Sequence, residues 1–213
     1  MNRYLIEFIG TFFLVITIAL TGNPLAIGAA LMVMIYMGGH ISGAHYNPAV
    51  SFAVLMRGKL PGKDFIPYIL FQILGAFAAA AVAFYFSGKT PFPAPGPGID
   101  FMKATIAEIV FTFALTTVIL NVATTKSTYG NNYYGLAIGF TVLAGAFAVG
   151  GVSGGAFNPA VAIGLILMDT LKGGTSINNI LIYLVGPFGG AGLAVIVFRI
   201  TNPAEFIEDV KKA

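Results

Sequence analysis

Long apolar stretches alternate with short polar breaks along the whole chain. Each stretch is about 17 to 24 residues long, which at a helical rise of about 1.5 Å per residue spans a hydrocarbon layer of about 30 Å. The breaks are rich in glycine, proline and charged residues, which interrupt or end helices. The pattern predicts six membrane-spanning helices, at about residues 3–21, 25–41, 64–87, 101–124, 133–150 and 177–200.

Two further apolar segments, at about residues 47–57 and 158–168, are too short to cross a membrane. A helix of about ten residues covers about 15 Å, which is half of the hydrocarbon layer. Each segment lies between two predicted spans, so we expect two re-entrant half-helices that enter and leave the membrane on the same side.

The composition agrees with a surface that faces a lipid bilayer. Hydrophobic residues make up 57% of the 213 positions and charged residues only 9%, whereas soluble domains carry roughly a quarter charged residues. The chain has no cysteine, which excludes disulfide and thiolate chemistry. Its two histidines, His40 and His45, have no carboxylate pair nearby in the sequence, so we expect no metal site, no cofactor and no enzyme active site.

The lysines and arginines indicate how the spans are oriented. Cytoplasmic loops carry an excess of these residues, and an N-terminus in the cytoplasm places eight of them inside and three outside. The inside set is Arg3, Arg57, Lys59, Lys63, Lys126, Arg199, Lys211 and Lys212, and the outside set is Lys89, Lys103 and Lys172. We therefore interpret the net charge of +3 as a topology signal, with both termini cytoplasmic, and expect no nucleic-acid partner.

The two halves of the chain repeat each other. The segment Ser42–Val50 recurs as Ser153–Val161, and Glu7 in the first span is matched by Glu108 in the fourth. Each half holds three spans, an odd number, so the second half is inverted relative to the first. We expect a single channel domain over residues 1–213, with repeats at 1–88 and 101–200, an extracellular linker at 89–100 and a cytoplasmic tail at 201–213.

An Asn-Pro-Ala motif opens each predicted half-helix. Asparagine is among the best residues before a helix, and proline is favoured at the first helical position. Each asparagine side chain can cap the backbone with its oxygen while its amide group points a donor into a pore. The motif residues are Asn47, Pro48 and Ala49, and Asn158, Pro159 and Ala160.

A glycine-rich, non-helical stretch precedes each motif. Irregular backbone at membrane depth is tolerated only where it is buried in protein or lines a water-filled cavity, so we expect its carbonyl groups to form a ladder of acceptors. The ladder residues are Gly43, Ala44, His45 and Tyr46, and Gly154, Gly155, Ala156 and Phe157. Both half-helices would aim the positive ends of their dipoles at the pore centre, which disfavours cations and protons.

The paired motifs, the glutamates of spans one and four and the three-plus-three topology resemble the aquaporin, or major intrinsic protein, family over nearly the whole chain. The resemblance implies a right-handed all-α bundle of six spanning helices and two half-helices, assembled as a homotetramer with one pore per subunit. It also favours Glu7 and Glu108 as braces of the re-entrant loops over a proton relay. A third copy, Asn202-Pro203-Ala204, follows no glycine-rich stretch, and we interpret it as the end of the last span.

The family's outer constriction, carried over by position, falls on Ile27, Ala146, Gly155 and Val161. In water-selective members of the family, these four positions typically hold an aromatic residue, a histidine, a small residue and an arginine. Here Val161 stands in place of the arginine, which removes five donors and a full charge. Members of the family that are specialised for glycerol typically carry aspartate at the position of Ala162. The alanine here therefore favours a water channel.

The predicted function is a passive channel for water, with some leakage of glycerol, urea or ammonia, in the plasma membrane of a prokaryote. A secondary transporter stays open as the alternative, because inverted repeats and broken helices suit it equally. His45 is open to two interpretations, a pH-sensitive gate or a neutral residue that fixes the loop.

Overall fold

The computed structural model describes residues 1–205 and is all-helical over that range, which confirms the predicted fold class. Within this range, six helices are long and apolar enough to span a membrane. Four of them are α1 (Asn2–Thr21), α2 (Pro24–Ser42), α4 (Gly62–Ser87) and α5 (Phe101–Thr124). The other two are α6 (Tyr134–Ser153) and α8 (Ile180–Thr201).

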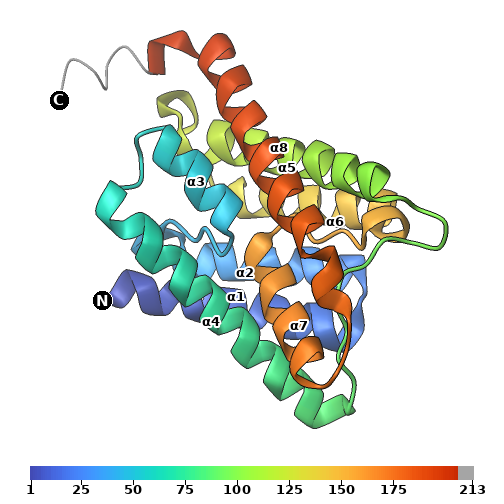
Figure 1. Cartoon of the computed structure of the whole chain (residues 1–213). Helices are drawn as coiled ribbons and strands as arrows, with labels where there is room; N and C mark the ends of the chain where they lie inside the picture. The colour runs from blue at the N-terminus through green and yellow to red at the C-terminus, as the bar shows by residue number, and fades with distance from the viewer. Residues whose placement is uncertain (206–213) are drawn as a thin grey trace.

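The short helices α3 (Pro48–Met56) and α7 (Pro159–Leu171) are the expected half-helices. Two brief 3-10 turns, η1 (Lys126–Thr128) and η2 (Ser176–Asn179), lie before α6 and α8. The first residues of the expected sixth span therefore belong to η2. Figure 1 shows α3 and α7 between α4 and α8.

Helices α2 and α6 run past their predicted ends. The sequence places these ends at about residues 41 and 150, whereas the helices continue to Ser42 and Ser153. Gly43 and Gly154 end them, each with a φ of 88°, which is the left-handed conformation that suits glycine after a helix. Gly150 and Gly151 lie inside α6.

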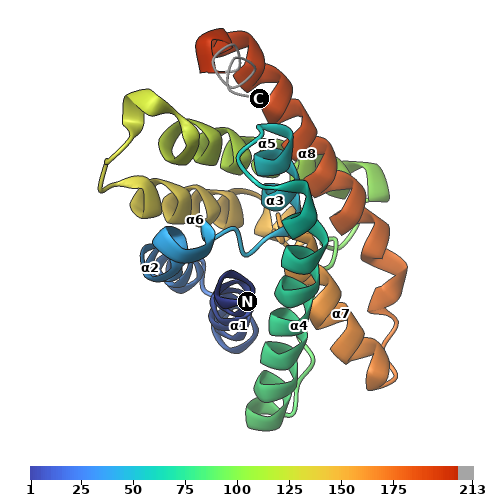
Figure 2. The ribbon, with the colours of Figure 1, turned by 90° about the vertical axis from the view of Figure 1, so that its left-hand side faces the viewer.

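The packing repeats between the two halves. Helix α1 packs on α4 and α2, just as α5 packs on α8 and α6. Each half-helix also reaches the other half, since α3 contacts α8 and α7 contacts α4. In Figure 2, α2 and α6 lie side by side at the junction of the halves.

Glycines allow the longest helices to approach closely. A Cβ atom at Gly75 of α4 would overlap the Phe8 backbone of α1, and one at Gly190 of α8 would overlap the Ile109 backbone of α5. These two pairs occupy matching places in the repeat. The small residues of α4 and α8 therefore permit close backbone packing, as in many membrane helix pairs.

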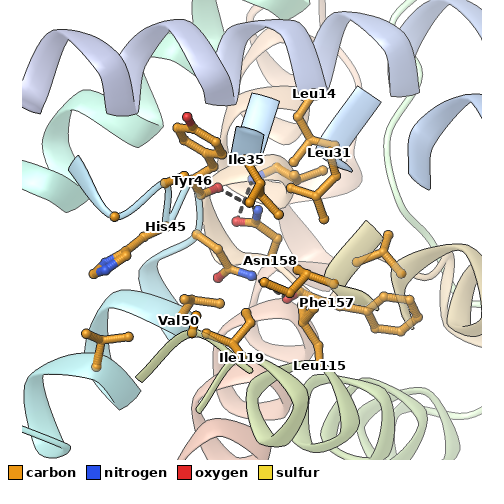
Figure 3. A pocket seen from close by; sticks show the side chains of 18 of the residues that line it. Leu14, Leu31, Ile35, His45, Tyr46, Val50, Leu115, Ile119, Phe157 and Asn158 are labelled. Atoms are coloured by element: carbon orange, nitrogen blue, oxygen red, sulfur yellow. Dashed lines mark hydrogen bonds between the residues drawn. The ribbon is translucent and has the colours of Figure 1, made fainter. Parts of the chain in front are cut away.

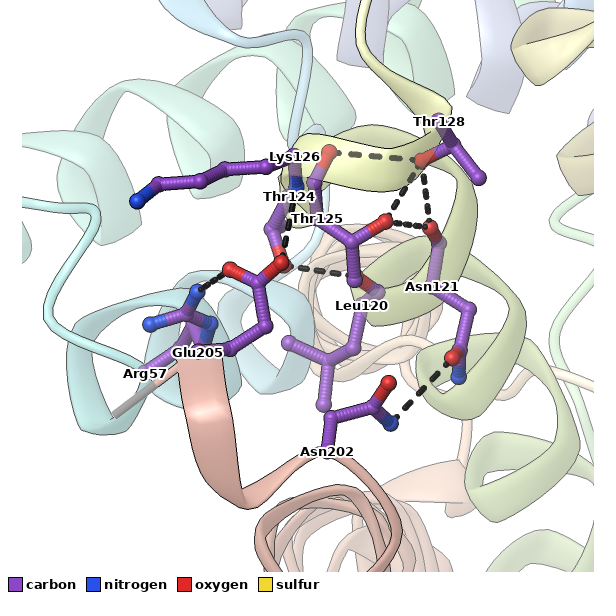
Figure 4. A network of polar contacts seen from close by, with 9 residues as sticks. All are labelled: Arg57, Leu120, Asn121, Thr124, Thr125, Lys126, Thr128, Asn202 and Glu205. Atoms are coloured by element: carbon purple, nitrogen blue, oxygen red, sulfur yellow. Dashed lines mark hydrogen bonds and ion pairs between the residues drawn. The ribbon is translucent and has the colours of Figure 1, made fainter. Parts of the chain in front are cut away.

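An ion-pair network ties three segments together at the end of the bundle that holds Arg3 and Lys126 (Figure 4). Glu205 accepts hydrogen bonds from Nη2 of Arg57 at 2.7 Å and from the backbone N–H of Lys126 at 2.8 Å. The Arg57 side chain is fully buried, and its guanidinium lies 5.4 Å from the centre of the Phe198 ring. The expected tail at 201–213 thus begins with an anchored turn, and residues 206–213 lie outside the described residues.

Replacing this carboxylate should lower stability. Glu205→Gln leaves only one acceptor oxygen for two donors, and hydrogen bonds to charged groups contribute about 1.5–3 kcal/mol. We expect a lower midpoint of thermal unfolding in detergent, followed by the loss of helical circular dichroism. The matched control is Asp100→Asn, which changes an exposed carboxylate and keeps a good helix cap. Equal midpoints for both variants would contradict a stabilising role for the network.

Candidate functional site

A cavity of about 1520 Å³ extends from one end of the bundle to the other. Arg3, Lys59 and Lys126 line it at one end, and Gly22 and Pro24 line it at the other. Between them it is bordered by Asn47 and Asn158. The two Asn-Pro-Ala motifs therefore lie at one continuous cavity.

Each asparagine caps its half-helix with its side-chain oxygen. Oδ1 of Asn47 accepts a hydrogen bond from the N–H of Ala49 at 2.9 Å. Oδ1 of Asn158 accepts from the N–H groups of Ala160 at 2.9 Å and Val161 at 3.4 Å. Asn47 and Asn158, which precede α3 and α7, each bond to the loop that leads into the other half-helix and line the cavity, so the positive ends of both helix dipoles face the cavity there.

The asparagine amide groups hold the opposite loop. Nδ2 of Asn47 donates to the carbonyl of Phe157, and Nδ2 of Asn158 donates to the carbonyl of Tyr46, both at 2.8 Å. The sequence predicted that these two carbonyls belong to the ladder of acceptors for permeating molecules. In the structure each of them accepts a hydrogen bond from an asparagine instead. Because an amide group carries two hydrogens, one N–H of each asparagine is left for another partner.

The remaining ladder residues also line the cavity: Gly43, Ala44, His45, Gly154, Gly155 and Ala156. Aliphatic side chains form other parts of the wall, as Figure 3 shows for Leu14, Leu31, Ile35 and Val50 around Asn158. The cavity therefore combines polar backbone with an apolar wall.

Both loops adopt the same unusual backbone. Left-handed φ angles occur at Ala44 (52°) and Tyr46 (50°), and at the matching Gly155 (62°) and Phe157 (49°). Such angles are unfavourable for residues other than glycine, and they persist only where the surroundings hold them. The contacts around each loop are therefore expected to be numerous.

Glu7 supplies the contacts for the first loop. Its Oε1 accepts hydrogen bonds from the Ser42 hydroxyl at 2.7 Å and the His45 N–H at 3.0 Å. Its Oε2 accepts from the Tyr46 N–H at 2.7 Å and from Nε2 of Gln72 at 2.8 Å. The carboxylate is fully buried and satisfied by four donors.

Glu108 of α5 supplies the matching contacts for the second loop, and its carboxylate accepts hydrogen bonds from three donors in the structure. Oε1 accepts from the Ser153 hydroxyl at 2.7 Å and the Ala156 N–H at 3.0 Å, and Oε2 accepts from the Phe157 N–H at 2.6 Å. The residue that corresponds to Gln72 in the repeat is Pro187, which has no side-chain donor. The second brace therefore lacks the fourth bond.

Two serine–tyrosine pairs complete the loops, and sequence reasoning assigned them no role. Tyr68 donates its hydroxyl hydrogen to the Ser42 carbonyl at 2.6 Å, and Tyr183 donates to the Ser153 carbonyl at 2.5 Å. The sequence did contain a signal for these pairs, because the serine and the tyrosine each recur at matching positions of the two halves.

His45 belongs to a polar chain that only the first loop has. Nδ1 of His45 lies 3.0 Å from Oγ of Ser51, which also accepts from Nε2 of Gln72 at 3.0 Å. In the second loop the matching residues are Ala156, Ala162 and Pro187. The imidazole thus borders the cavity while one of its nitrogens is tied to the scaffold.

The four positions carried over to the outer constriction all line the cavity: Ile27, Ala146, Gly155 and Val161. A Cβ atom at Gly155 would lie 3.6 Å from the Cα atom of Ala146, so these two backbones are neighbours. None of the four has a polar side chain. The nearby segment Pro91–Ala94 also lines the cavity and packs against Gly154.

Comparison with known proteins agrees with this geometry. The family described as Major intrinsic protein matches residues 17–198. The aquaporin AqpM of Methanothermobacter thermautotrophicus is 34% identical, over 93% of this chain and 96% of its own length. The glycerol uptake facilitator protein-like 6 of Lactiplantibacillus plantarum is 37% identical, over 94% of this chain and 98% of its own.

A solved structure shows the same fold. The aquaglyceroporin of Plasmodium falciparum superposes with a TM-score of 0.83, covering 97% of this chain and 98% of its own, at 24% sequence identity. This likeness extends over both halves, including the re-entrant segments. The match to the family over residues 17–198, together with relatives above 30% identity over nearly the whole chain, shows that the chain belongs to the major intrinsic protein family.

Proposed function

We propose that the chain is a passive channel that lets water and small neutral solutes cross a membrane, excludes ions and performs no enzymatic reaction. The observation that carries this proposal is the pair of half-helices whose capped N-termini face each other at a continuous cavity. The names of the matched relatives, an aquaporin and a glycerol uptake facilitator-like protein, support the same substrate classes.

Ions and protons would be rejected at the asparagine pair. The positive ends of two helix dipoles converge there and oppose cations. The second N–H of Asn47 and of Asn158 offers a donor to a passing oxygen atom, and the ladder carbonyls offer acceptors. A neutral solute exchanges its hydrogen bonds with these groups, whereas an ion would lose hydration without sufficient replacement.

The outer constriction would be permissive. Ile27, Ala146, Gly155 and Val161 supply neither a side-chain donor nor a charge. We therefore propose that glycerol, urea and ammonia pass along with water. The constriction would select by size and by the cost of passing an apolar segment.

The proposed setting is a plasma membrane, with the N- and C-termini cytoplasmic and the 89–100 linker outside. The excess of lysine and arginine at the end that holds Arg3, Arg57 and Lys126 supports this orientation. Residues 1–88 and 101–200 act as inverted repeats of one channel domain, and the subunit assembles as a homotetramer with one pore in each copy.

Solute flux in proteoliposomes tests the proposal against a transporter. We expect water, glycerol and urea fluxes above those of empty vesicles, with a weak dependence on temperature, because no conformational cycle is needed for each solute molecule. Stopped-flow light scattering over a range of temperatures measures both properties. A steep temperature dependence with saturating solute flux would indicate alternating access and contradict the channel.

A further inference from the structure

The orientation of each motif asparagine depends on a residue of the opposite loop. Asn158 donates to the carbonyl of Tyr46, and Asn47 donates to the carbonyl of Phe157. An amide group that turned away from its carbonyl would present a different donor to the cavity. Whatever fixes the Tyr46 carbonyl therefore also fixes Asn158.

Tyr46 is held by three contacts around its left-handed backbone. Its N–H donates to Oε2 of Glu7 at 2.7 Å, and its hydroxyl donates to the Met34 carbonyl of α2 at 2.9 Å. Its ring is fully buried, and a Cβ atom added at Gly10 or Gly38 would overlap its side chain. Figure 3 shows the ring directed away from Asn158, while the carbonyl faces the asparagine amide.

The matching residue of the second loop is held differently. Phe157 has no hydroxyl, and its ring centre lies 5.7 Å from that of Phe111. A Cβ atom at Gly145 would come within 2.9 Å of the Phe157 ring. The first loop therefore has an anchor, from the Tyr46 hydroxyl to the backbone of α2, that the second loop lacks.

We propose that Tyr46 is a positioning residue for proton exclusion: its anchored ring fixes its own carbonyl, which in turn fixes the amide of Asn158. The proposal rests on the channel function proposed above. The backbone strain at Tyr46 gives the physical reason, since a left-handed residue relaxes when the contacts that hold it are removed. Relaxation would move the carbonyl away from Asn158 and weaken the orientation of the donor at the centre of the cavity.

Graded variants separate the ring from the hydroxyl. Tyr46→Leu removes the packing of the ring and the hydrogen bond of the hydroxyl, and we expect the ratio of proton to water permeability to rise about tenfold or more. Tyr46→Phe keeps the ring in its slot between Gly10 and Gly38, so the ratio should rise less. Gly10→Ala displaces the ring from a distance and should change the ratio in the same direction as Tyr46→Leu.

The controls match each change in chemistry. Tyr85→Leu replaces a tyrosine that is 84% exposed, and Gly192→Ala adds a methyl group where no atom lies within 4 Å. Neither should alter the ratio. Combining Gly10→Ala with Tyr46→Leu should add little to Tyr46→Leu alone, because Gly10→Ala acts through the ring that Tyr46→Leu removes.

Both permeabilities are measured on the same proteoliposomes, with an entrapped pH-sensitive dye and by light scattering. A second readout is the nitrogen NMR signal of the Asn158 side-chain amide, which should shift in Tyr46→Leu and Gly10→Ala and not in the controls. An unchanged ratio together with an unchanged signal in folded Tyr46→Leu and Gly10→Ala would overturn the positioning role. If the wild-type protein conducts no water, the channel proposal fails, and the Asn158 signal alone decides whether Tyr46 positions the asparagine.

Discussion

Val161→Arg should reduce glycerol and urea permeation far more than water permeation. The guanidinium adds five hydrogen-bond donors and a positive charge to the cavity wall at Val161, where we propose the outer constriction together with Ile27, Ala146 and Gly155. It also fills space, because arginine is much longer than valine. We expect the solute fluxes to fall by about tenfold or more, while water, which is smaller, continues to pass.

The control for size is Val161→Leu, which adds bulk without charge or donors. It should lower the solute fluxes less than the arginine variant does. Swelling of proteoliposomes in glycerol, urea and an impermeant sugar measures all three variants on one scale. Solute fluxes that stay at the wild-type level in a folded Val161→Arg protein would show that Val161 does not lie at the narrowest point.

Glu7→Gln should destabilise the protein more than Glu108→Gln does. In each variant an amide group replaces one carboxylate oxygen, and the donors at that oxygen lose their acceptor. At Glu7 either oxygen serves two donors, the Ser42 hydroxyl and the His45 N–H at Oε1, and the Tyr46 N–H and one N–H of Gln72 at Oε2. At Glu108 the amide can take the place of Oε2, which serves only the Phe157 N–H. Each buried donor without a partner costs about 1–3 kcal/mol, so we expect losses of about 2–6 kcal/mol for Glu7→Gln and about 1–3 kcal/mol for Glu108→Gln.

Unfolding of the two variants in detergent, followed by circular dichroism under identical conditions, gives the comparison. Gln72→Leu serves as a third variant, since it removes the donor that only the first loop has. In the Gln72→Leu background, Glu7→Gln should still destabilise the protein more than Glu108→Gln does, but the difference between the two losses of unfolding free energy should be smaller. Equal losses for the two glutamate variants in the wild-type background would contradict the difference between the braces.

The spans and half-helices could be predicted from the sequence because their signals are local. The length of an apolar stretch sets whether it crosses the membrane, and Asn-Pro marks where a half-helix begins. The predicted ends of α2 and α6, at about residues 41 and 150, fall short of the ends that the structure shows at Ser42 and Ser153. Only the structure shows that Gly43 and Gly154, rather than Gly150, take the left-handed conformation that ends a helix.

The partners within the site depend on contacts between distant segments, which no local pattern contains. Repeat symmetry indicates that Ser42 and Tyr68 matter, but it does not say that both serve the loop before Asn47. It also cannot show that Arg57, counted as a cytoplasmic charge, is fully buried against Glu205. The bonds between the asparagines and the opposite carbonyls arise only when the two inverted halves meet.

The two loops are alike in backbone and unequal in support. The first has Gln72, the chain from His45 to Ser51 and the Tyr46 hydroxyl, while the second has none of these at matching positions.

We propose that the two facing half-helices form one pore that passes water and stops protons. Water and proton permeability of the wild-type protein, measured on the same proteoliposomes, test it most directly. We expect a water permeability about tenfold or more above that of empty vesicles, with proton permeability unchanged from the lipid background. Water permeability equal to that of empty vesicles, or a proton flux that rises together with the water flux, would contradict it.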